Sequence, residues 1–383
     1  MSTTTLVYLD NAATTRLDAR VREAMLPFLD MEFGNPSSLH AAGRAARVAV
    51  ERARAHVAAL IGATPAEIIF TSGGTEGDNT ALAFARLRAG KDRPPVIVTS
   101  PAEHQAVLAP CAMMTDADIR YLAVDAGAVP DVTAITGPFD LLSVMQVNNE
   151  TGGVLDLRAA ASLAREAGGL LHSDLVQSAG KIPIDVQALG VDIAVLSAHK
   201  IHGPKGIGAL YLRSGVEMAR FMHGGSQERG RRGGTENVAA IVGFGEAARL
   251  ALVEMEQRRM LWTALRAQAC DLLRSELPHC IINEASGEVS PAILSVSFPW
   301  EHYAVDGELL LLELDLHGVA ASGGSACTAG SFEASHVMRA IGHDARTARA
   351  TVRLSFGAFT TRDEVDFALR TLIAAVRRFT VVG

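Results

Sequence analysis

The chain has 383 residues, of which 49% are hydrophobic and 20% charged, and its mean hydropathy is +0.20. This balance is typical of a well-buried globular protein and excludes a disordered chain, and the length predicts one large domain with a smaller one. The net charge of −7 and the pI near 6.0 argue against a nucleic-acid-binding protein. Such a protein needs a surface rich in Lys and Arg to neutralise the phosphate backbone of the nucleic acid.

No apolar run approaches the roughly 18 residues that a membrane-spanning helix needs. The first residues, MSTTTLVYLD, lack the basic segment and apolar core of a signal peptide, so we expect a cytoplasmic protein. The four cysteines, Cys111, Cys270, Cys280 and Cys327, are widely spaced and form no CxxC pair or Cys/His cluster. Neither a disulfide framework nor a structural metal is therefore indicated.

The first part of the chain alternates helix-like and strand-like segments. Between about residues 37 and 60, Ala and Val alternate with Arg at helical spacing, which predicts an amphipathic helix. The run EIIF then enters TSGGTEGDN and an Ala/Leu-rich stretch, an order typical of a strand, a glycine turn and a helix. Further apolar runs, VIVT, LLSVMQV, GLLHSD, DIAVLSA and GALYL, are separated by helix-like segments such as LRAAASLAREAGG. This alternation predicts an α/β domain with a mostly parallel sheet, which we place at residues 15–255.

The pattern of the sequence changes after about residue 255. A long helix-like stretch, EMEQRRMLWTALRAQACDLLRSELP, is followed by SVSF, the helix-like GELLLLELDLHG, VRLSFG and a terminal helix. We therefore expect a smaller α+β domain formed by residues 256–383, with residues 1–14 packed against it.

The glycine turn TSGGTEGDN is a candidate phosphate site. Its glycines permit close approach of the backbone, Thr75 can form a hydrogen bond, and the free N–H groups of a helix start face any anion there. The alternative is that these glycines serve only the tight turn between strand and helix. The turn matches neither the P-loop GxxxxGK[ST] nor the dinucleotide GxGxxG, which disfavours ATP and NAD as ligands.

Two opposite charges follow two of the apolar runs. Asp174 stands at the end of GLLHSD with Gln177 close behind, and Lys200 stands at the end of DIAVLSAHK. The alternative for Asp174 is that it only caps a helix. Open α/β sheets, however, bind ligands at the carboxyl ends of their strands. A lysine and an aspartate at that edge, beside a phosphate turn, point to a pyridoxal phosphate site.

Ten motifs that follow one another along the chain resemble a single enzyme family. They are YLDNAATT, GNPSSLH, TSGGTEGDN, EHQAV, VNNETG, HSDLVQSAGKIPID, SAHKIHGPKGIGALY, QERGRRGGTEN, SGGSACTAGS and VRLSFG, and they extend from Tyr8 to beyond Arg353. Together they are similar to the cysteine desulfurases of the NifS/IscS type, which are class V aminotransferase-like enzymes. The resemblance implies an α/β, fold-type I PLP-dependent transferase with a seven-stranded-type sheet in the large domain. It also implies pyridoxal 5'-phosphate as the cofactor.

The resemblance implies roles for individual residues. Lys200 resembles the lysine that holds the cofactor as a Schiff base and moves the substrate proton, and His104 resembles the histidine that stacks on the ring. Asp174 is similar to the aspartate that keeps the ring nitrogen protonated. Arg353 resembles the residue that grips the substrate carboxylate, a geometry suited to guanidinium. The remaining implied contacts are Gly74, Thr75, Ser197 and His199 around the phosphate, Gln177 and Asn148 near the phenolic oxygen, and Asn148 also at the substrate.

Two further residues follow from the resemblance. Thr235, in QERGRRGGTEN, is similar to the residue that reaches the phosphate of a partner subunit, which implies an obligate homodimer. Cys327 lies in SGGSACTAGS, a run too rich in Gly, Ser and Ala for a packed strand. We expect a mobile loop there, whose thiol takes sulfur at the cofactor and hands it on. Two departures from the family pattern, GTEGDN and ETGGV, leave these residues in place.

The implied function is a cysteine desulfurase, which converts L-cysteine into L-alanine and transfers the sulfur to Cys327 as a persulfide. An iron–sulfur scaffold or another sulfur-acceptor protein is the expected partner. Binding to nucleic acid or to a membrane is not expected. One alternative is a selenocysteine lyase or small-substrate class V aminotransferase, which needs Lys200 but not Cys327. Another is a non-catalytic assembly scaffold, which is disfavoured because every expected catalytic residue type is present. The sequence does not identify the sulfur acceptor.

Overall fold

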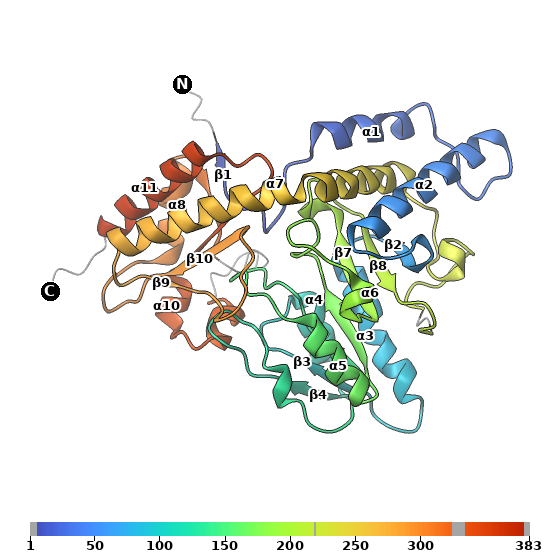
Figure 1. Ribbon diagram of the computed structural model, residues 1–383, viewed down its shortest axis with the longest axis horizontal. Helices are drawn as coiled ribbons and strands as arrows, with labels where there is room; N and C mark the ends of the chain where they lie inside the picture. Colours follow the sequence, from blue (N-terminus) through green and yellow to red (C-terminus); the bar gives the residue numbers. More distant parts are fainter. Residues whose placement is uncertain (1–5, 218–219, 324–333, 379–383) are drawn as a thin grey trace.

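The structure, a computed structural model, describes residues 6–217, 220–323 and 334–378. Its helices and strands form two groups joined by one long helix, α7 (Val238–Glu276), which runs across both groups in Figure 1. The two ends of the described chain lie on the side of the second group. The candidate residue Cys327 lies outside the described residues.

A large, mostly parallel sheet forms the centre of the first group. Within the described residues it has seven strands in the order β2-β8-β7-β6-β5-β3-β4. β8 is antiparallel to both of its neighbours, and the other neighbouring pairs are parallel. This confirms the predicted α/β fold. The strands are β2 (Ile68–Thr71), β3 (Val96–Thr99), β4 (Asp118–Tyr121), β5 (Leu141–Ser143), β6 (Leu170–Asp174), β7 (Ile193–Ser197) and β8 (Gly208–Leu212).

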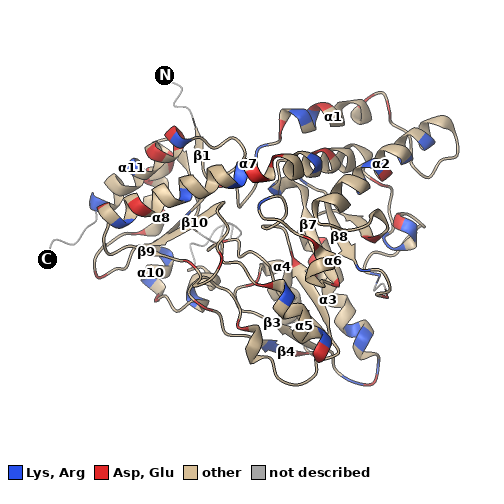
Figure 2. Cartoon of the chain, in the orientation of Figure 1, with Lys and Arg blue, Asp and Glu red and all other residues tan. Residues whose placement is uncertain are grey.

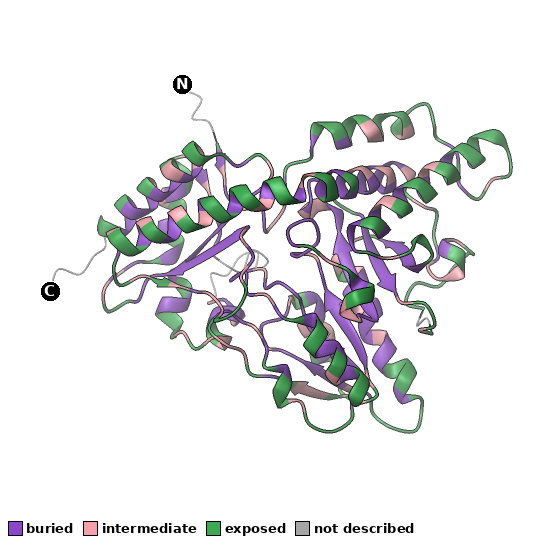
Figure 3. Ribbon diagram, in the orientation of Figure 1, coloured by how far each residue is buried: buried purple, intermediate pink, exposed green. Residues whose placement is uncertain are grey.

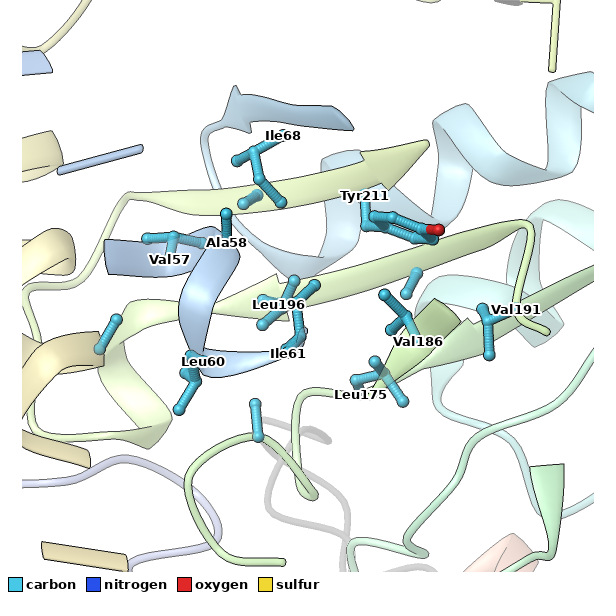
Figure 4. Close-up of a cluster of buried hydrophobic side chains, with 14 of the residues drawn as sticks. Val57, Ala58, Leu60, Ile61, Ile68, Leu175, Val186, Val191, Leu196 and Tyr211 are labelled. Carbon is cyan, nitrogen blue, oxygen red and sulfur yellow. The ribbon is translucent and has the colours of Figure 1, made fainter. Parts of the chain in front are cut away.

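Helices cover both faces of this sheet, since parallel neighbours must be joined by crossovers. Because side chains alternate along a strand, Ala194 and Leu196 of β7 enter a core with α2 and α6, whereas Val195 enters one with α3 and α4. Figure 4 shows part of the first core, in which Leu196 and Ile61 belong to one cluster. The helices are α1 (Ala19–Leu29), α2 (Ala41–Leu60), α3 (Gly74–Ala89), α4 (Gln105–Met113), α5 (Leu157–Glu166) and α6 (Val186–Leu189).

The ends of β6 and β7 bring two predicted residues to one edge of the sheet. The strands are parallel neighbours, and Asp174 at the end of β6 is in register with Val195 of β7. Both strands are buried along their whole length, as is usual for parallel strands covered on two faces. After Ser197 the chain forms a short 3-10 turn, η3 (Ala198–Lys200). Asp174 and Lys200 therefore lie at the same carboxyl edge, as the sequence predicts.

Helix α7 begins earlier than the sequence predicts. The helix expected from about residue 254 is only its second half, because α7 already starts at Val238. Gly243 and Gly245 lower the helical propensity of the first half. A Cβ at Gly245 would lie 2.5 Å from the Cα of Ala53, so this glycine lets α7 pack closely on α2. Figure 3 shows this half mainly buried and the second half more exposed.

The second group is built on two small sheets. In the described part of the chain, β12, β10 and β9 form an antiparallel sheet, and β1 pairs in parallel with β11. The strand β1 near the start of the chain therefore pairs with this group. A separate core joins these strands to α8, α11 and the second half of α7. The elements are β1 (Val7–Tyr8), β9 (Ile281–Ile282), β10 (Ile293–Ser297), α8 (Gly307–Leu316), β11 (Val319–Ala320), α9 (His336–Ala340), α10 (Ala345–Arg349), β12 (Thr351–Ser355) and α11 (Arg362–Arg378).

The predicted division into residues 15–255 and 256–383 falls within the continuous helix α7, and it stays a prediction.

Charged residues of both signs occur together on outer helices such as α7 and α11 (Figure 2). An example on α7 is the ion pair Arg249–Glu246 at 2.6 Å, and partly exposed pairs of this kind are worth below about 1 kcal/mol. Among the helices that the structure describes, none has the length and apolar character to cross a membrane.

Candidate active site

A cavity of about 440 Å³ lies at the carboxyl ends of β6 and β7. The central sheet and α3 supply much of its lining, and α9 and β12 of the second group complete it. Residues that are scattered along the chain therefore meet at one place. Nine of the twelve predicted site residues line the cavity, namely Gly74, Thr75, His104, Asp174, Gln177, Ser197, His199, Lys200 and Arg353.

The start of α3 forms one wall of the cavity. The helix begins at Gly74, so the N–H groups of its first turn have no carbonyl partner within the helix. A Cβ at Gly77 would lie 2.7 Å from Cγ1 of Val195, and the glycine therefore lets α3 lie directly on β7. Thr75 and Ser197 add hydroxyl groups to the same wall. This arrangement is suited to binding an anion such as phosphate.

Lys200 reaches the cavity from the turn after β7. Its Nζ donates hydrogen bonds to the backbone carbonyls of Ala12 (2.6 Å) and Ala13 (2.7 Å), which come from the start of the chain. The neighbouring His199 lies with Nδ1 3.1 Å from Oγ1 of Thr14. Burial, reinforced by Lys200 and other lysines, lowers the pKa of His199 to about 4. The imidazole beside the lysine is therefore neutral at pH 7.

Asp174 is the acidic counterpart of Lys200. It is 8% exposed, and its Oδ1 accepts a hydrogen bond from the backbone N–H of Val176 (2.8 Å). Burial raises the pKa of Asp174 above its ordinary value, whereas His104, the Val176 N–H and Lys200 act in the opposite direction. A cationic ring nitrogen in the cavity would favour the ionised form of this carboxyl group, as any nearby positive charge does.

His104 caps the start of α4 and faces the cavity. Its Nδ1 accepts a hydrogen bond from the backbone N–H of Ala106 (3.1 Å), so the hydrogen of the neutral ring is assigned to Nε2. Burial lowers the pKa of His104, and Asp174 opposes this shift only in part, while Lys200 adds to it. The residue therefore presents an uncharged aromatic face, which suits stacking against a flat ring.

Arg353 reaches the cavity from β12. It is 1% exposed, and its two Nη atoms donate to the carbonyl oxygen of Asn149 and to Oδ1 of Asp10, both at 2.8 Å. These partners hold the plane of the guanidinium in one orientation. A fixed guanidinium is suited to two-pronged recognition of a carboxylate.

Asn148 does not line the cavity, in contrast to the prediction. Its Nδ2 donates to the carbonyl of Ala102 (3.0 Å), and its Oδ1 accepts from the backbone N–H of Glu150 (2.9 Å). The amide is thus used to hold the turn after β5. The adjacent Asn149 lines the cavity instead, because neighbouring side chains of this turn point in different directions. Asn149 rather than Asn148 therefore lines the cavity, and the predicted contacts of Asn148 with cofactor and substrate stay predictions.

Two other predicted residues are not in this cavity as described. Thr235 is exposed on the segment before α7 and does not line the cavity of its own chain. Its role toward a partner subunit stays a prediction. Cys327 belongs to residues 324–333, outside those described, so its role stays a prediction as well.

The site also contains ionisable residues that the sequence reasoning missed. Asp78 of α3, Glu150 and His336 line the cavity, and Glu103 is buried next to His104. Burial raises the pKa of Glu103 to about 8 and that of Asp78 well above its ordinary value. The departure GTEGDN was a signal for Asp78, which stands within it. For Glu103, nothing in the local sequence separates a buried carboxyl group from an exposed one.

These groups fit pyridoxal phosphate. Lys200 is a primary amine that can bond to an aldehyde, Asp174 is a carboxyl group for a ring nitrogen, and the start of α3 is an anion site. The cavity volume is in the range usual for small-molecule sites. In the ranges of the chain that are described, no cluster of three or more His, Cys, Asp or Glu side chains could hold a metal ion.

Comparison with known proteins gives matches over nearly the whole chain. The family model for aminotransferase class-V matches residues 7–367. The chain is similar to cysteine desulfurase IscS of Dictyoglomus turgidum, with 42% identity over 386 residues, covering 98% of this chain and 96% of that protein. It is also similar to the solved structure of a NifS-like protein, with a TM-score of 0.88, 35% identity, and coverage of 97% of this chain and 100% of the other. The structure of SspA in complex with cysteine matches with a TM-score of 0.78 and 31% identity, covering 92% and 99% of the two chains.

Proposed function

The chain belongs to the class-V aminotransferase family, and we propose that it is a pyridoxal-phosphate-dependent cysteine desulfurase. The observation that carries the proposal is the single cavity in which Lys200, Asp174 and the start of α3 meet. The proposal is supported by a relative named cysteine desulfurase at 42% identity and by a similar structure in complex with cysteine. The reaction converts L-cysteine into L-alanine and leaves the sulfur on the protein.

The cofactor is held by residues that line the cavity. Lys200 holds its aldehyde carbon, Asp174 pairs with its ring nitrogen, and His104 stacks on the ring. When bound, the cofactor withdraws electrons from the substrate and thereby weakens the bonds at its Cα. The phosphate group is bound at the start of α3 by Gly74 and Thr75, together with Ser197 and His199.

Arg353 orients the substrate, and Lys200 removes a proton from it. Arg353, held by Asp10 and the Asn149 carbonyl, binds the substrate carboxylate. With the substrate amine bound to the cofactor, the amine of Lys200 would be free to accept the Cα proton. His104 is neutral with its hydrogen on Nε2, and it exchanges a proton with the substrate.

Cys327 accepts the sulfur in the proposed reaction. Its thiolate attacks the substrate sulfur, so that a sulfur–sulfur bond forms while the substrate Cβ–S bond breaks. The electron pair of the broken bond stays with the carbon skeleton, which takes up protons and leaves as alanine. The persulfide then passes its outer sulfur to an acceptor, which we take to be an iron–sulfur scaffold or another sulfur-acceptor protein.

The protein functions as a homodimer in the cytoplasm under this proposal. Thr235 is exposed and lies away from the cavity of its own chain, which supports a role at the phosphate of the partner subunit. The site is then complete only when two chains associate.

The test is to incubate the purified protein with L-cysteine and to measure alanine and protein-bound persulfide together. We expect both products from the wild type, neither from Lys200→Ala, and a bound cofactor without persulfide from Cys327→Ala. The matched control is Cys111→Ala, which should keep most of the activity because Cys111 is buried in α4 and burial raises its pKa to about 11. Alanine release by Cys327→Ala at a near wild-type rate would contradict the proposal and would favour a lyase that needs no protein thiol.

A further inference from the structure

A second lysine lies buried behind the cavity. Lys181 lies seven residues after Asp174, the last residue of β6, and is 4% exposed. Gly180 makes this burial possible: its φ is +72°, and a Cβ there would lie 2.9 Å from Ala251 of α7. Lysine is almost never fully buried without a partner, so its contacts need an explanation. The chain has only four lysines, which are Lys91, Lys181, Lys200 and Lys205.

The contacts of Lys181 lead directly to the catalytic lysine of the proposed function. Its Nζ donates a hydrogen bond to Oε1 of Gln177 (2.5 Å). Nε2 of Gln177 donates to the carbonyl oxygen of Ala12 (2.8 Å), and Nζ of Lys200 donates to the same oxygen (2.6 Å). Lys181 and Lys200 also line one small internal cavity of about 10 Å³. Both lysines and the glutamine therefore belong to one connected polar network.

This network determines which end of the Gln177 amide faces which partner. The Ala12 carbonyl can only accept, so the NH2 group of Gln177 faces it and Oε1 faces Lys181, whose charged form can only donate. With one hydrogen of that NH2 group used by Ala12, the other is available to a ligand. Gln177 lines the main cavity, so that ligand is the molecule bound there. An amide in the reverse orientation would leave Lys181 without an acceptor and the Ala12 carbonyl facing an oxygen.

We propose that Lys181 is a positioning residue, which holds the Gln177 amide so that its NH2 group donates to the phenolic oxygen of the cofactor. The proposal rests on the proposed function, because it assumes that the cavity binds pyridoxal phosphate. Donation to that oxygen stabilises its anionic form. It therefore makes the positively charged nitrogen that Lys200 forms with the cofactor a stronger acid.

A positive charge on Lys181 also makes the nitrogen that Lys200 forms with the cofactor a stronger acid. Burial, together with the charges of Lys200 and Arg353, lowers the pKa of Lys181 to about 7, while Asp174 acts in the opposite direction. By reciprocity, a charge on Lys181 disfavours a charge on the Lys200 nitrogen. The titratable or charged groups that face Lys181 are Lys200 and His199 of the η3 turn, His202 beyond it, Asp174 of β6, Arg353 of β12 and Arg258 of α7.

The first test is a pH titration of the visible absorption band of the protein loaded with pyridoxal phosphate. In Lys181→Met the apolar stem is kept while the charge and the donor are removed. We expect the midpoint of the titration to rise by about one pH unit, because the Gln177 donor is no longer held toward the phenolic oxygen and the neighbouring charge is lost. The matched control is Lys91→Met, which removes an exposed lysine and should leave the midpoint unchanged. An unchanged midpoint in Lys181→Met with cofactor bound would overturn the proposal.

A double-mutant cycle then tests whether Lys181 acts through Gln177. The same titration is carried out with Lys181→Met in a Gln177→Leu background. If Lys181 positions the amide, the shift caused by Lys181→Met is smaller in that background than in the wild type. Equal shifts in the two backgrounds would overturn the positioning role.

A measurement on the wild type keeps the proposal testable if Lys181→Met does not fold. Because the chain has four lysines, the side-chain NMR signals of isotope-labelled lysine are few, and Lys91→Met, Lys200→Ala and Lys205→Met assign them by subtraction. The pKa of Lys181 should be about 7. Titration of Lys181 together with the exposed Lys91 would mean that it is not held in the network, and would overturn the proposal. Failure of the wild type to bind pyridoxal phosphate would instead contradict the proposed function itself.

Discussion

Several carboxyl groups are buried together at the cavity, and they differ in their partners. Asp174 lies near Lys200 and His104, which favour its ionised form. Glu103 is 1% exposed, and it interacts with the hydroxyl of Ser100 (2.8 Å) and the backbone N–H of Met145 (2.9 Å). Burial without a cation partner favours the neutral acid. Glu103 is therefore a protonated, structural carboxyl group next to His104, which faces the cavity.

Replacing Glu103 by Gln should change how stability depends on pH. Burial raises the pKa of Glu103 from an ordinary 4.5 to about 8 in the folded protein. Between these values the folded state keeps a proton that the unfolded state releases, so the stability of the wild type falls as the pH rises. Glu103→Gln lacks this loss, and from about pH 5 to about pH 8 it should gain roughly 2–4 kcal/mol relative to the wild type.

Urea unfolding of both cofactor-free proteins at the two pH values measures this difference. Glu23→Gln, at an exposed position of α1, is the matched control for loss of a carboxyl group. A stability difference between wild type and Glu103→Gln that is the same at both pH values would show that Glu103 does not hold a proton in the folded state.

At the scale of elements, the decisive contact is that of α3 on β7. Gly77 faces Val195, and the absence of a Cβ lets the start of the helix lie against the strand that leads to Lys200. The spacing between helix and strand sets the distance between the anion site and the lysine. A single missing carbon atom therefore helps to determine the size of the cofactor site.

Gly77→Ala should separate α3 from β7. Its Cβ would lie 2.7 Å from Cγ1 of Val195, well inside the normal contact distance, and such overpacking costs about 1–3 kcal/mol of stability. The cofactor should also bind more weakly, because the first turn of α3 moves away from Ser197. Thermal unfolding measures the first effect, and titration of the cofactor-free protein with pyridoxal phosphate measures the second.

The compensating change is Val195→Ala, which removes the atoms that the new Cβ would meet. Combined with Gly77→Ala, it should restore part of the cofactor affinity even though Val195→Ala alone leaves a small cavity. Purely additive losses in the double variant would mean that the contact between α3 and β7 is not what limits the site.

At the scale of the whole molecule, the site is assembled from segments that are distant in the sequence. Arg353 of β12 bonds to Asp10 near the start of the chain and to the Asn149 carbonyl after β5. α7 packs on α2 with its first half and on the second core with its other half, so it holds the two groups of elements together. The orientation of Arg353 toward Lys200 is therefore a property of the complete fold.

Subunit mixing tests the proposed dimer at the same scale. Chains with Lys200→Ala and chains with Thr235→Ala should each lose most of their activity. Heterodimers of the two should regain one working site, because one of the two sites then contains both an intact Lys200 and an intact Thr235 from the other chain. Activity is measured as alanine release, and sedimentation confirms that heterodimers have formed. Proven heterodimers without any regained activity would contradict the exchange of Thr235 between subunits.

The sequence alone determined the α/β class, the position along the chain of six strands of the large sheet, and the position of two key charges. It did not predict β4 or the order of the strands within the sheet. Each apolar run is long enough for one buried strand, and the first polar residue after it marks the edge of the sheet. That is why Asp174 and Lys200 could be assigned to one edge without coordinates. The glycine turn before α3 could be located for the same reason, because its signal is local.

Only the tertiary structure decided which side chains are buried and which way they point. It placed Asn149 rather than Asn148 at the cavity, extended α7 back to Val238, and buried Lys181 against Gln177. These features depend on contacts between segments far apart in the chain, such as Gly245 with Ala53 and Lys200 with Ala12. Burial removes water and changes the charge that a side chain carries, whereas a local sequence pattern records only the residue type.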